Sequence, residues 1–249
     1  MCFDLDSAPP IPVIAGAAVS HDDEVLQATD GNQFAAFVAT PDEDARVGVV
    51  IYPDVRGLYR FYEELALRFA ERGIAAVAFD YFGRTAGTEK RDDDFDYPPH
   101  VAQTTDNGVQ GDARACVAHL HSRGVERVFG VGFCFGGRAS WIGAASGHGL
   151  AGSIGFYGSP TRRRGGPSAV DRAYEIAAPI LALQAGDDPN ITADDNAAFE
   201  RALKRHGVEH EVVTYDGAPH SFFDRKQEEF ADVSDDAWRR TLAFIESHS

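Results

Sequence analysis

Cys134 is the side chain in this sequence best placed for covalent chemistry. It stands in the motif Gly-Phe-Cys-Phe-Gly-Gly at residues 132–137, after an apolar run typical of a buried strand and before a helical pattern. A nucleophile on such a turn needs glycine two positions before and two after it, because side chains there would collide with the strand and the helix. The helix N-terminus points N–H groups at the sulfur and favours the thiolate. The motif predicts a nucleophilic cysteine, and the alternative is a small buried apolar residue.

A cysteine nucleophile needs a histidine that handles protons and a carboxylate that orients the histidine. Of the nine histidines, His220 is the one that follows the last predicted strand in a turn of glycine and proline. Asp187 and Asp188 follow an earlier predicted strand, and because adjacent side chains project differently, either can be the acid. Both loops lie at the carboxyl ends of predicted strands, where open α/β sheets bind their ligands. The chain order is then nucleophile, acid, histidine, as in hydrolases of this architecture.

The elements that must bring these loops together follow from the apolar pattern. Runs rich in β-branched residues alternate with amphipathic stretches that end at glycine. We expect strands at residues 24–28, 33–39, 47–52, 74–79, 127–132, 150–157, 179–184 and 210–215. We expect helices at residues 59–72, 112–123, 134–146, 193–206 and 234–247. This alternation predicts an α/β fold with a mostly parallel central sheet and helices on both faces.

Two segments fall outside the alternation. Residues 1–20 contain three prolines that cannot join a central strand, so we expect an irregular N-terminal arm. Residues 83–108 form a long acidic stretch, which is either a functional loop or a solvated excursion. The remainder contains no repeat and no linker, and residues 1–249 are therefore expected to form a single domain.

Composition excludes several classes of partner. The formal net charge is −16, which disfavours nucleic acid and anionic membrane surfaces as partners. The sequence shows no signal peptide and no apolar stretch long enough to span a membrane. Three cysteines are a poor disulfide framework and indicate a reducing compartment, so we expect a cytoplasmic protein. The sequence leaves open whether it is a monomer or a homodimer.

Three motifs resemble those of the dienelactone hydrolase family, a branch of the α/β-hydrolases. They are the cysteine motif at 132–137, Gly-Asp-Asp at 186–188 and Gly-Ala-Pro-His-Ser-Phe-Phe at 217–223, and the resemblance spans about residues 30–248. Cysteine rather than serine in the first motif distinguishes this family from serine esterases. The resemblance implies an α/β-hydrolase fold without a large cap domain. It also favours Asp188 as the acid, because the family has an apolar residue three positions later, as Ile191 is here; Asp187 is the reserve.

The resemblance implies further parts of an active site. Family members carry a glutamate, on the loop before the first helix, that helps to deprotonate the thiol. The matching residue here is Asp54, which is one methylene shorter. The N–H groups of the next residue, Val55, and of Phe135 after the nucleophile would form the oxyanion hole.

Family members also hold the carboxylate of the substrate with arginines, and here this chain departs from the pattern. Asp224 lies near the expected place of one arginine, with Arg225 beside it, and Arg91 is a candidate for the other. Arg56 or the run at residues 162–164 could serve instead, although three adjacent charges are also typical of a solvated face. The candidate substrate contacts are Arg56, Phe133, Tyr157 and Phe222.

We therefore expect a hydrolase of lactones or activated carboxylic esters that needs neither cofactor nor metal. One alternative keeps the same triad and hydrolyses activated phosphate esters. A second is a redox-sensing thiol protein, although no resolving cysteine lies in the same segment as Cys134. A third is a non-catalytic binding module, because a fold alone does not determine function.

Overall fold

One eight-stranded sheet runs through the computed structural model, which describes residues 3–4, 6–92, 94–162 and 166–249. Its strands are β1 (Val19–Gln27), β2 (Gln33–Pro41), β3 (Val47–Tyr52), β4 (Ala75–Phe79), β5 (Arg127–Phe133), β6 (Gly152–Phe156), β7 (Ile180–Asp187) and β8 (His210–Pro219). Their order across the sheet is β1-β2-β4-β3-β5-β6-β7-β8. β2 is antiparallel to both of its neighbours and the remaining pairs are parallel, so the predicted mostly parallel sheet is confirmed.

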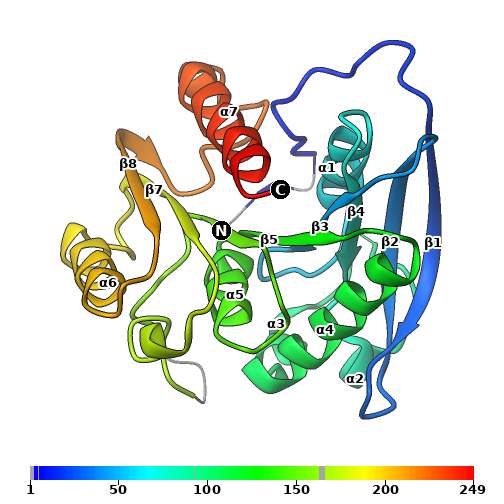
Figure 1. Ribbon diagram of the computed structural model, residues 1–249, viewed down its shortest axis with the longest axis horizontal. Helices are drawn as coiled ribbons and strands as arrows, with labels where there is room; N and C mark the ends of the chain where they lie inside the picture. The colour runs from blue at the N-terminus through cyan, green and yellow to red at the C-terminus, as the bar shows by residue number, and fades with distance from the viewer. Residues whose placement is uncertain (1–2, 5, 93, 163–165) are drawn as a thin grey trace.

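Helices cover both faces of this sheet (Figure 1). They are α1 (Arg60–Ala70), α2 (Gly83–Ala86), α3 (Pro98–Gln103), α4 (Asp106–Ser122), α5 (Phe135–Ala144), α6 (Ala193–Arg205) and α7 (Ala231–Ser247), with 3₁₀ turns η1 (Ala173–Glu175) and η2 (Glu228–Phe230). One apolar core joins the sheet to α1 and α7, and a second joins its other face to α4, α5 and α6. The predicted two-sided packing is confirmed.

The burial pattern explains why these segments are helical. In α1, Phe61, Leu65 and Phe69 follow one another at intervals of four residues and are completely buried against the sheet. α6 begins with a capping box, in which the Thr192 hydroxyl accepts from the N–H of Asp195 and the Asp195 carboxylate accepts from the N–H of Thr192.

The segment 83–108, expected to be a functional loop or a solvated excursion, is more ordered than either expectation. It contains α2, α3 and the first residues of α4, which begins at Asp106 rather than at residue 112. Two prolines begin α3, where the lack of an N–H is harmless. The Thr105 hydroxyl caps α4 by accepting from the N–H of Gly108.

The N-terminal arm contributes to the core. Phe3 is 3% exposed and stacks on Phe61 of α1, with ring centroids 3.9 Å apart. Further along the arm, Ile11 is also buried, and the first strand begins at Val19. Among the described residues, no helix has both the length and the apolar character that crossing a membrane requires.

Candidate active site

Cys134 lies on a sharp turn between β5 and α5. Its backbone has φ 55° and ψ −111°, a conformation that L-residues rarely adopt and that often marks a functional site. A Cβ on Gly132 would lie 2.0 Å from the Gly136 carbonyl oxygen, and one on Gly136 would lie 2.0 Å from the Tyr52 carbonyl oxygen. The predicted need for glycine on both sides of the cysteine is therefore confirmed, because α5 passes directly over the ends of β3 and β5.

The turn is fixed to the neighbouring strand and faces a cavity. The Cys134 N–H donates to the Phe156 carbonyl oxygen at 3.0 Å, and the side chain is half-buried. It lines a cavity of about 500 Å³, which we name the thiol cavity. The described residues around it are Val55, Val101, Cys134, Phe135, Arg138, Tyr157, Ser159, Arg162, Pro189, Asn190, Ile191 and His220.

His220 lies on the wall of the same cavity and is oriented by Asp188. The imidazole Nδ1 is 2.5 Å from the Asp188 carboxylate, whose side chain is 1% exposed. Although burial opposes ionisation, the hydrogen bonds from His220 and from the Asn190 N–H lower the pKa of Asp188 below its ordinary value. The carboxylate therefore stays charged beside the imidazole and fixes its orientation.

A bulge in β8, opposite Gly186 of β7, lies just before the two adjacent aspartates. The pairing with β8 shifts between Ala185 and Asp187, and a Cβ on Gly186 would lie 2.5 Å from the Tyr215 carbonyl oxygen. Beyond the bulge, Asp187 is exposed whereas Asp188 is buried against His220. The structure thus brings Asp188, and not the reserve Asp187, to the histidine.

The residues expected to form the oxyanion hole lie at the thiol cavity. Val55 follows β3 and Phe135 begins α5, and both contribute to the cavity wall. The first backbone N–H groups of a helix have no partner within the helix, so that of Phe135 is suited to bind a negative oxygen.

Asp54, the expected activator of the thiol, is buried and hydrogen-bonded to residues of its own loop and of the start of α1. Its side chain is completely buried and accepts from the Arg56 N–H at 2.8 Å and from the Tyr59 hydroxyl at 2.9 Å. Burial raises the pKa of Asp54, an effect that the nearby Arg56 guanidinium partly opposes. Asp54 is absent from the described lining of the thiol cavity, whereas its neighbour Val55 is present.

The candidate substrate contacts divide into two groups. Tyr157, at φ 37°, lies on the cavity wall with its ring 4.9 Å from that of His220. Phe133 and Phe222 are 1% and 0% exposed and belong to the core on the α1 and α7 side. The Arg56 guanidinium stacks on Tyr59 at 4.1 Å and does not appear in the described cavity lining. The structure therefore brings only Tyr157 of this set to the cavity.

The other arginines that the sequence suggested as substrate contacts lie in different places. Arg162 is exposed and lines the thiol cavity, while residues 163 and 164 of the same run lie outside the described residues. Arg91 is bound to Asp80 in a buried ion pair. Arg225 lines a separate surface groove with Pro9 and Ile11 of the arm.

Sequence reasoning missed Arg138, which lines the thiol cavity from α5. It is 2% exposed, and its guanidinium forms two hydrogen bonds of 2.7 Å with Asp106 at the start of α4. It also donates to the Arg162 carbonyl oxygen at 2.8 Å, which ties the loop after β6 to α5. Its position one helical turn after Cys134 could have identified it, because residues four apart share one face of a helix.

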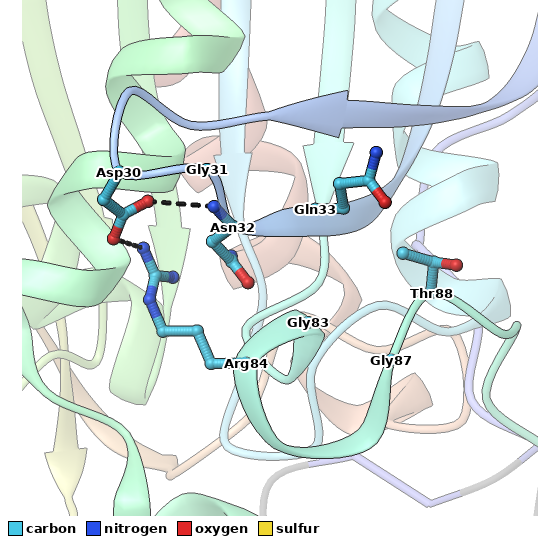
Figure 2. A pocket seen from close by; sticks show the side chains of 8 residues that line it. All are labelled: Asp30, Gly31, Asn32, Gln33, Gly83, Arg84, Gly87 and Thr88. Carbon is cyan, nitrogen blue, oxygen red and sulfur yellow. Dashed lines mark hydrogen bonds and ion pairs between the residues drawn. The ribbon is translucent and has the colours of Figure 1, made fainter.

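A larger surface hollow, of about 620 Å³, lies elsewhere (Figure 2). It is open and polar, between the β1–β2 turn and α2, and its Arg84 is paired with Asp30. None of Cys134, Asp188 and His220 lines it. Among the described residues, no three His, Cys, Asp or Glu side chains gather as metal ligands would.

Comparisons with known proteins indicate the family to which this chain is related. The dienelactone hydrolase family matches residues 34–249. A relative from Yersinia pestis, named as a carboxymethylenebutenolidase, is 24% identical over 237 residues, which cover 92% of this chain and 89% of the relative.

Two solved structures share the fold. One, named as a dienelactone hydrolase from Klebsiella pneumoniae, has a TM-score of 0.80 at 24% identity and covers 92% of this chain and 99% of its own. Another, named as a dienelactone hydrolase-like promiscuous phosphotriesterase from metagenomic libraries, has a TM-score of 0.76 at 22% identity and covers 93% and 99%. The predicted α/β-hydrolase fold is confirmed, and the described residues contain no large cap domain.

Proposed function

Because this chain belongs to the dienelactone hydrolase family, we propose that it hydrolyses lactones or activated carboxylic esters with Cys134 as nucleophile, His220 as base and Asp188 as orienting acid. The observation that carries the proposal is that His220, bound to Asp188 at 2.5 Å, lines the same cavity as Cys134. The strained backbone of Cys134 is a second support.

The proposed reaction has two stages. His220 takes the proton of the Cys134 thiol, the thiolate attacks the carbonyl carbon, and the oxygen that becomes negative is held by the N–H groups of Val55 and Phe135. The bond to the alcohol oxygen then breaks, and that oxygen takes a proton from His220. Water that gives its proton to His220 then attacks the thioester, and the acid and the thiol are released.

The composition of the thiol cavity supports a small substrate with an apolar part and a polar part. Val55, Val101, Phe135, Pro189 and Ile191 supply apolar wall, and the other described lining residues, two arginines among them, supply polar groups. Thiolates react well with activated esters, so enol-lactones and aryl esters suit this site better than amides do.

Hydrolysis of activated phosphate esters is a second candidate. The same N–H groups could hold a phosphoryl oxygen, and the exposed Arg162 on the cavity wall would favour a negative phosphate product. The metagenomic structure carries the name of a phosphotriesterase, but at 22% identity it supports only the shared fold. A panel of aryl carboxylic and aryl phosphate esters would separate the two activities.

Redox sensing and a purely binding role lack support in this chain. For redox sensing, Cys116 on α4 is the other cysteine among the described residues, and it is 0% exposed in the core; Cys2 lies outside those residues. For a non-catalytic binding module, membership of a hydrolase family is the opposing argument.

The direct test is Cys134→Ala, measured by the turnover of p-nitrophenyl acetate. We expect turnover to fall by at least about 1,000-fold, because the covalent step is removed while the fold is retained. Cys116→Ala is the matched control, since it removes a buried thiol away from the cavity and should keep turnover. Full activity in Cys134→Ala would refute the proposed function.

A further inference from the structure

The loop that carries Val55 is held by two buried carboxylates. This oxyanion loop, residues 53–58, connects β3 to α1. Asp54 fixes its first part through the Arg56 N–H and the Tyr59 hydroxyl. Asp80 fixes its last part, because its Oδ1 accepts from the Leu58 N–H at 3.1 Å. Asp80 lies outside the loop, directly after β4, and is 0% exposed.

The fit between Asp80 and the oxyanion loop is close. Gly57 has φ +81°, and a Cβ there would lie 2.4 Å from the Asp80 Oδ1. Glycine therefore lets the carboxylate approach the backbone and reach the next N–H. The Tyr81 hydroxyl adds a bond of 2.7 Å to the Pro53 carbonyl oxygen, so residues after β4 hold both ends of the loop.

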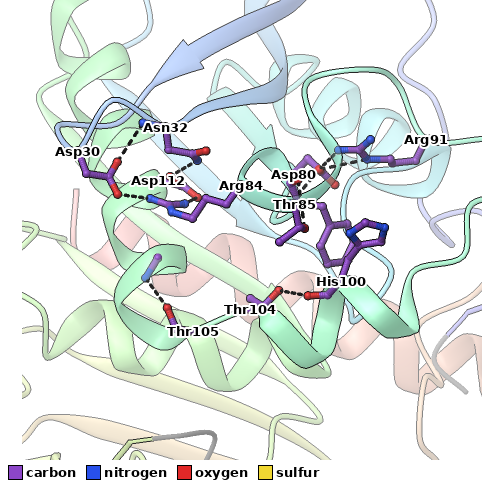
Figure 3. A network of polar contacts seen from close by, with 12 residues as sticks. Asp30, Asn32, Asp80, Arg84, Thr85, Arg91, His100, Thr104, Thr105 and Asp112 are labelled. Atoms are coloured by element: carbon purple, nitrogen blue, oxygen red, sulfur yellow. Dashed lines mark hydrogen bonds and ion pairs between the residues drawn. The ribbon is translucent and has the colours of Figure 1, made fainter.

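Arg91 stabilises the charge of Asp80. The Asp80 Oδ2 accepts from the Arg91 Nε at 3.2 Å and Nη2 at 2.8 Å, and from the Phe82 N–H at 3.0 Å (Figure 3). The guanidinium is itself fixed by the carbonyl oxygens of Ala86 and Gly87 and lies over the Phe95 ring at 4.7 Å. A buried carboxylate needs such pairing, because an unpaired buried charge is strongly destabilising.

From these contacts we infer that Asp80, held by Arg91, is a positioning residue that sets the place of the Val55 N–H at the thiol cavity. The inference rests on the proposed function, in which this N–H binds the oxyanion. Such donors must be in place before the reaction, and a small displacement weakens the transition state more than substrate binding. The acidic segment after α2 thereby acquires a role through Arg91, in addition to Val101 of α3 on the wall of the thiol cavity.

Asp80→Asn is the variant that tests this. The amide has almost the same shape, but in either orientation its NH₂ group would face a donor, the Leu58 N–H or those of Phe82 and Arg91, and would push the side chain or the loop from its place. We expect kcat for p-nitrophenyl acetate to fall about 10- to 100-fold, with KM changed less than about 3-fold.

Asp112→Asn is the matched control. Asp112 is 1% exposed and pairs with Arg84, and it accepts from the Asn32 side chain at 3.0 Å. Figure 3 shows this pair apart from the Asp80–Arg91 pair, with Arg84 and Asp112 directed to Asp30 and Asn32 of the β1–β2 turn. We expect this variant to lower Tm as Asp80→Asn does but to keep kcat within about 2-fold, because ion-pair loss alone does not move the oxyanion donor.

Alkylation of Cys134 by iodoacetamide separates the oxyanion loop from the nucleophile. This reaction needs the thiolate but no oxyanion hole, so its rate in Asp80→Asn should stay within about 2-fold of that of the unchanged protein. The Cys134→Ala protein gives the contribution of the other cysteines. If turnover and alkylation fall together, or if kcat equals that of Asp112→Asn, the positioning role is wrong.

Arg91→Gln carries the same comparison if Asp80→Asn does not fold. Arg91→Gln leaves the Asp80 carboxylate in place without its cation. We expect kcat to fall less than in Asp80→Asn, again with an unchanged rate of Cys134 alkylation. Unchanged kcat in Arg91→Gln would then overturn the inference. Turnover that survives in Cys134→Ala would instead refute the proposed function, whatever the Asp80 variants show.

Discussion

At the scale of single residues, Asp187 and Asp188 have the same chemistry and different surroundings. Asp187 is exposed at the end of β7, whereas Asp188 is buried and accepts from His220 and from the Asn190 N–H. A carboxylate in the second position holds the imidazole in one orientation, which the first position does not do.

The pair offers a matched test of the orienting acid. We expect Asp188→Asn to lower kcat on the order of 1,000-fold, because the amide would favour the wrong tautomer of His220. Asp187→Asn removes the same charge from an exposed site and should keep kcat within about 2-fold, since surface charges have small effects. Equal losses in both variants, measured with p-nitrophenyl acetate, would contradict the role given to Asp188.

The positions of some site residues could be predicted from the sequence and those of others could not, for a physical reason. Cys134 and His220 follow from motifs whose glycines and prolines restrict the backbone, so their places depend on local structure. The direction of Asp54 depends on its hydrogen bonds with the Arg56 N–H and the Tyr59 hydroxyl, which are local contacts that the match to a family motif does not specify. Phe133 and Phe222 point into the core because of strand phase and packing, which the motifs do not encode.

At the scale of elements, the crossing of α5 over the sheet depends on the absence of side chains at Gly132 and Gly136. The helix can begin directly after β5 because these two glycines let its backbone approach the backbone of β3. This close approach also places the first turn of α5 beside Val55, so the helix N-terminus and the oxyanion loop reach one cavity.

Gly136→Ala tests this crossing. A Cβ 2.0 Å from the Tyr52 carbonyl oxygen cannot be accommodated without moving the backbone, so we expect the free energy of unfolding to fall by more than about 3 kcal/mol. Gly111→Ala in α4 is the control, because its Cβ would meet only the Arg84 guanidinium at 3.7 Å. That change should stabilise the protein by roughly 0.5–1 kcal/mol. Denaturant unfolding measures both, and an unchanged midpoint in Gly136→Ala would contradict the argument.

The helices missed by the sequence prediction have weak local patterns. Gly108 and Gly111 lower the helix propensity of the first turns of α4, so the periodic pattern becomes clear only near residue 112. In the structure the Arg84 guanidinium lies beside both glycines, at ordinary contact distance from the place of a Cβ on either. Tertiary packing, and not helix propensity, therefore sets the N-terminal boundary of α4.

At the scale of the whole molecule, the alternation of strands and helices was sufficient to predict the sheet and its two covered faces. All eight expected strands are present, and β3 has the predicted bounds. The order β4-β3-β5 was not predictable in this way, because it depends on which helix crosses which face. The acidic surface, with a formal net charge of −16, likewise says little about the fold.

One buried histidine couples the stability of the whole fold to pH. His148 lies 9% exposed between α5 and β6, and its Nε2 donates to the Gln110 side chain at 2.9 Å. Burial, with smaller contributions from Arg114 and Arg172, lowers the pKa of His148 from 6.5 to about 4. Between these two values the unfolded chain binds a proton that the folded chain excludes, so acid favours unfolding.

We expect this histidine to lower the free energy of unfolding by about 3 kcal/mol as the pH falls from about 6.5 to about 4. Above about pH 6.5 His148 is neutral in both the folded and the unfolded chain, so it does not reduce the free energy of unfolding at neutral pH. The measurement is urea unfolding at several pH values, compared with His148→Gln, which removes the titration. His206→Gln, at the exposed end of α6, is the control and should keep the acid dependence. Identical pH profiles for His148→Gln and the unchanged protein would contradict this assignment.

The bulge in β8 opposite Gly186 has a consequence for how this protein can change by insertion and deletion. The extra residues lie on the strand that leads to His220, so the histidine meets the aspartate at one fixed position after β7. Because side chains alternate along a strand, one residue inserted before Asp187 would bring Asp187 to the position of Asp188, and one residue deleted there would bring Pro189 to it. When a loop is grafted between relatives, the number of residues in β7 must therefore stay the same, even if the Gly-Asp-Asp sequence is unchanged.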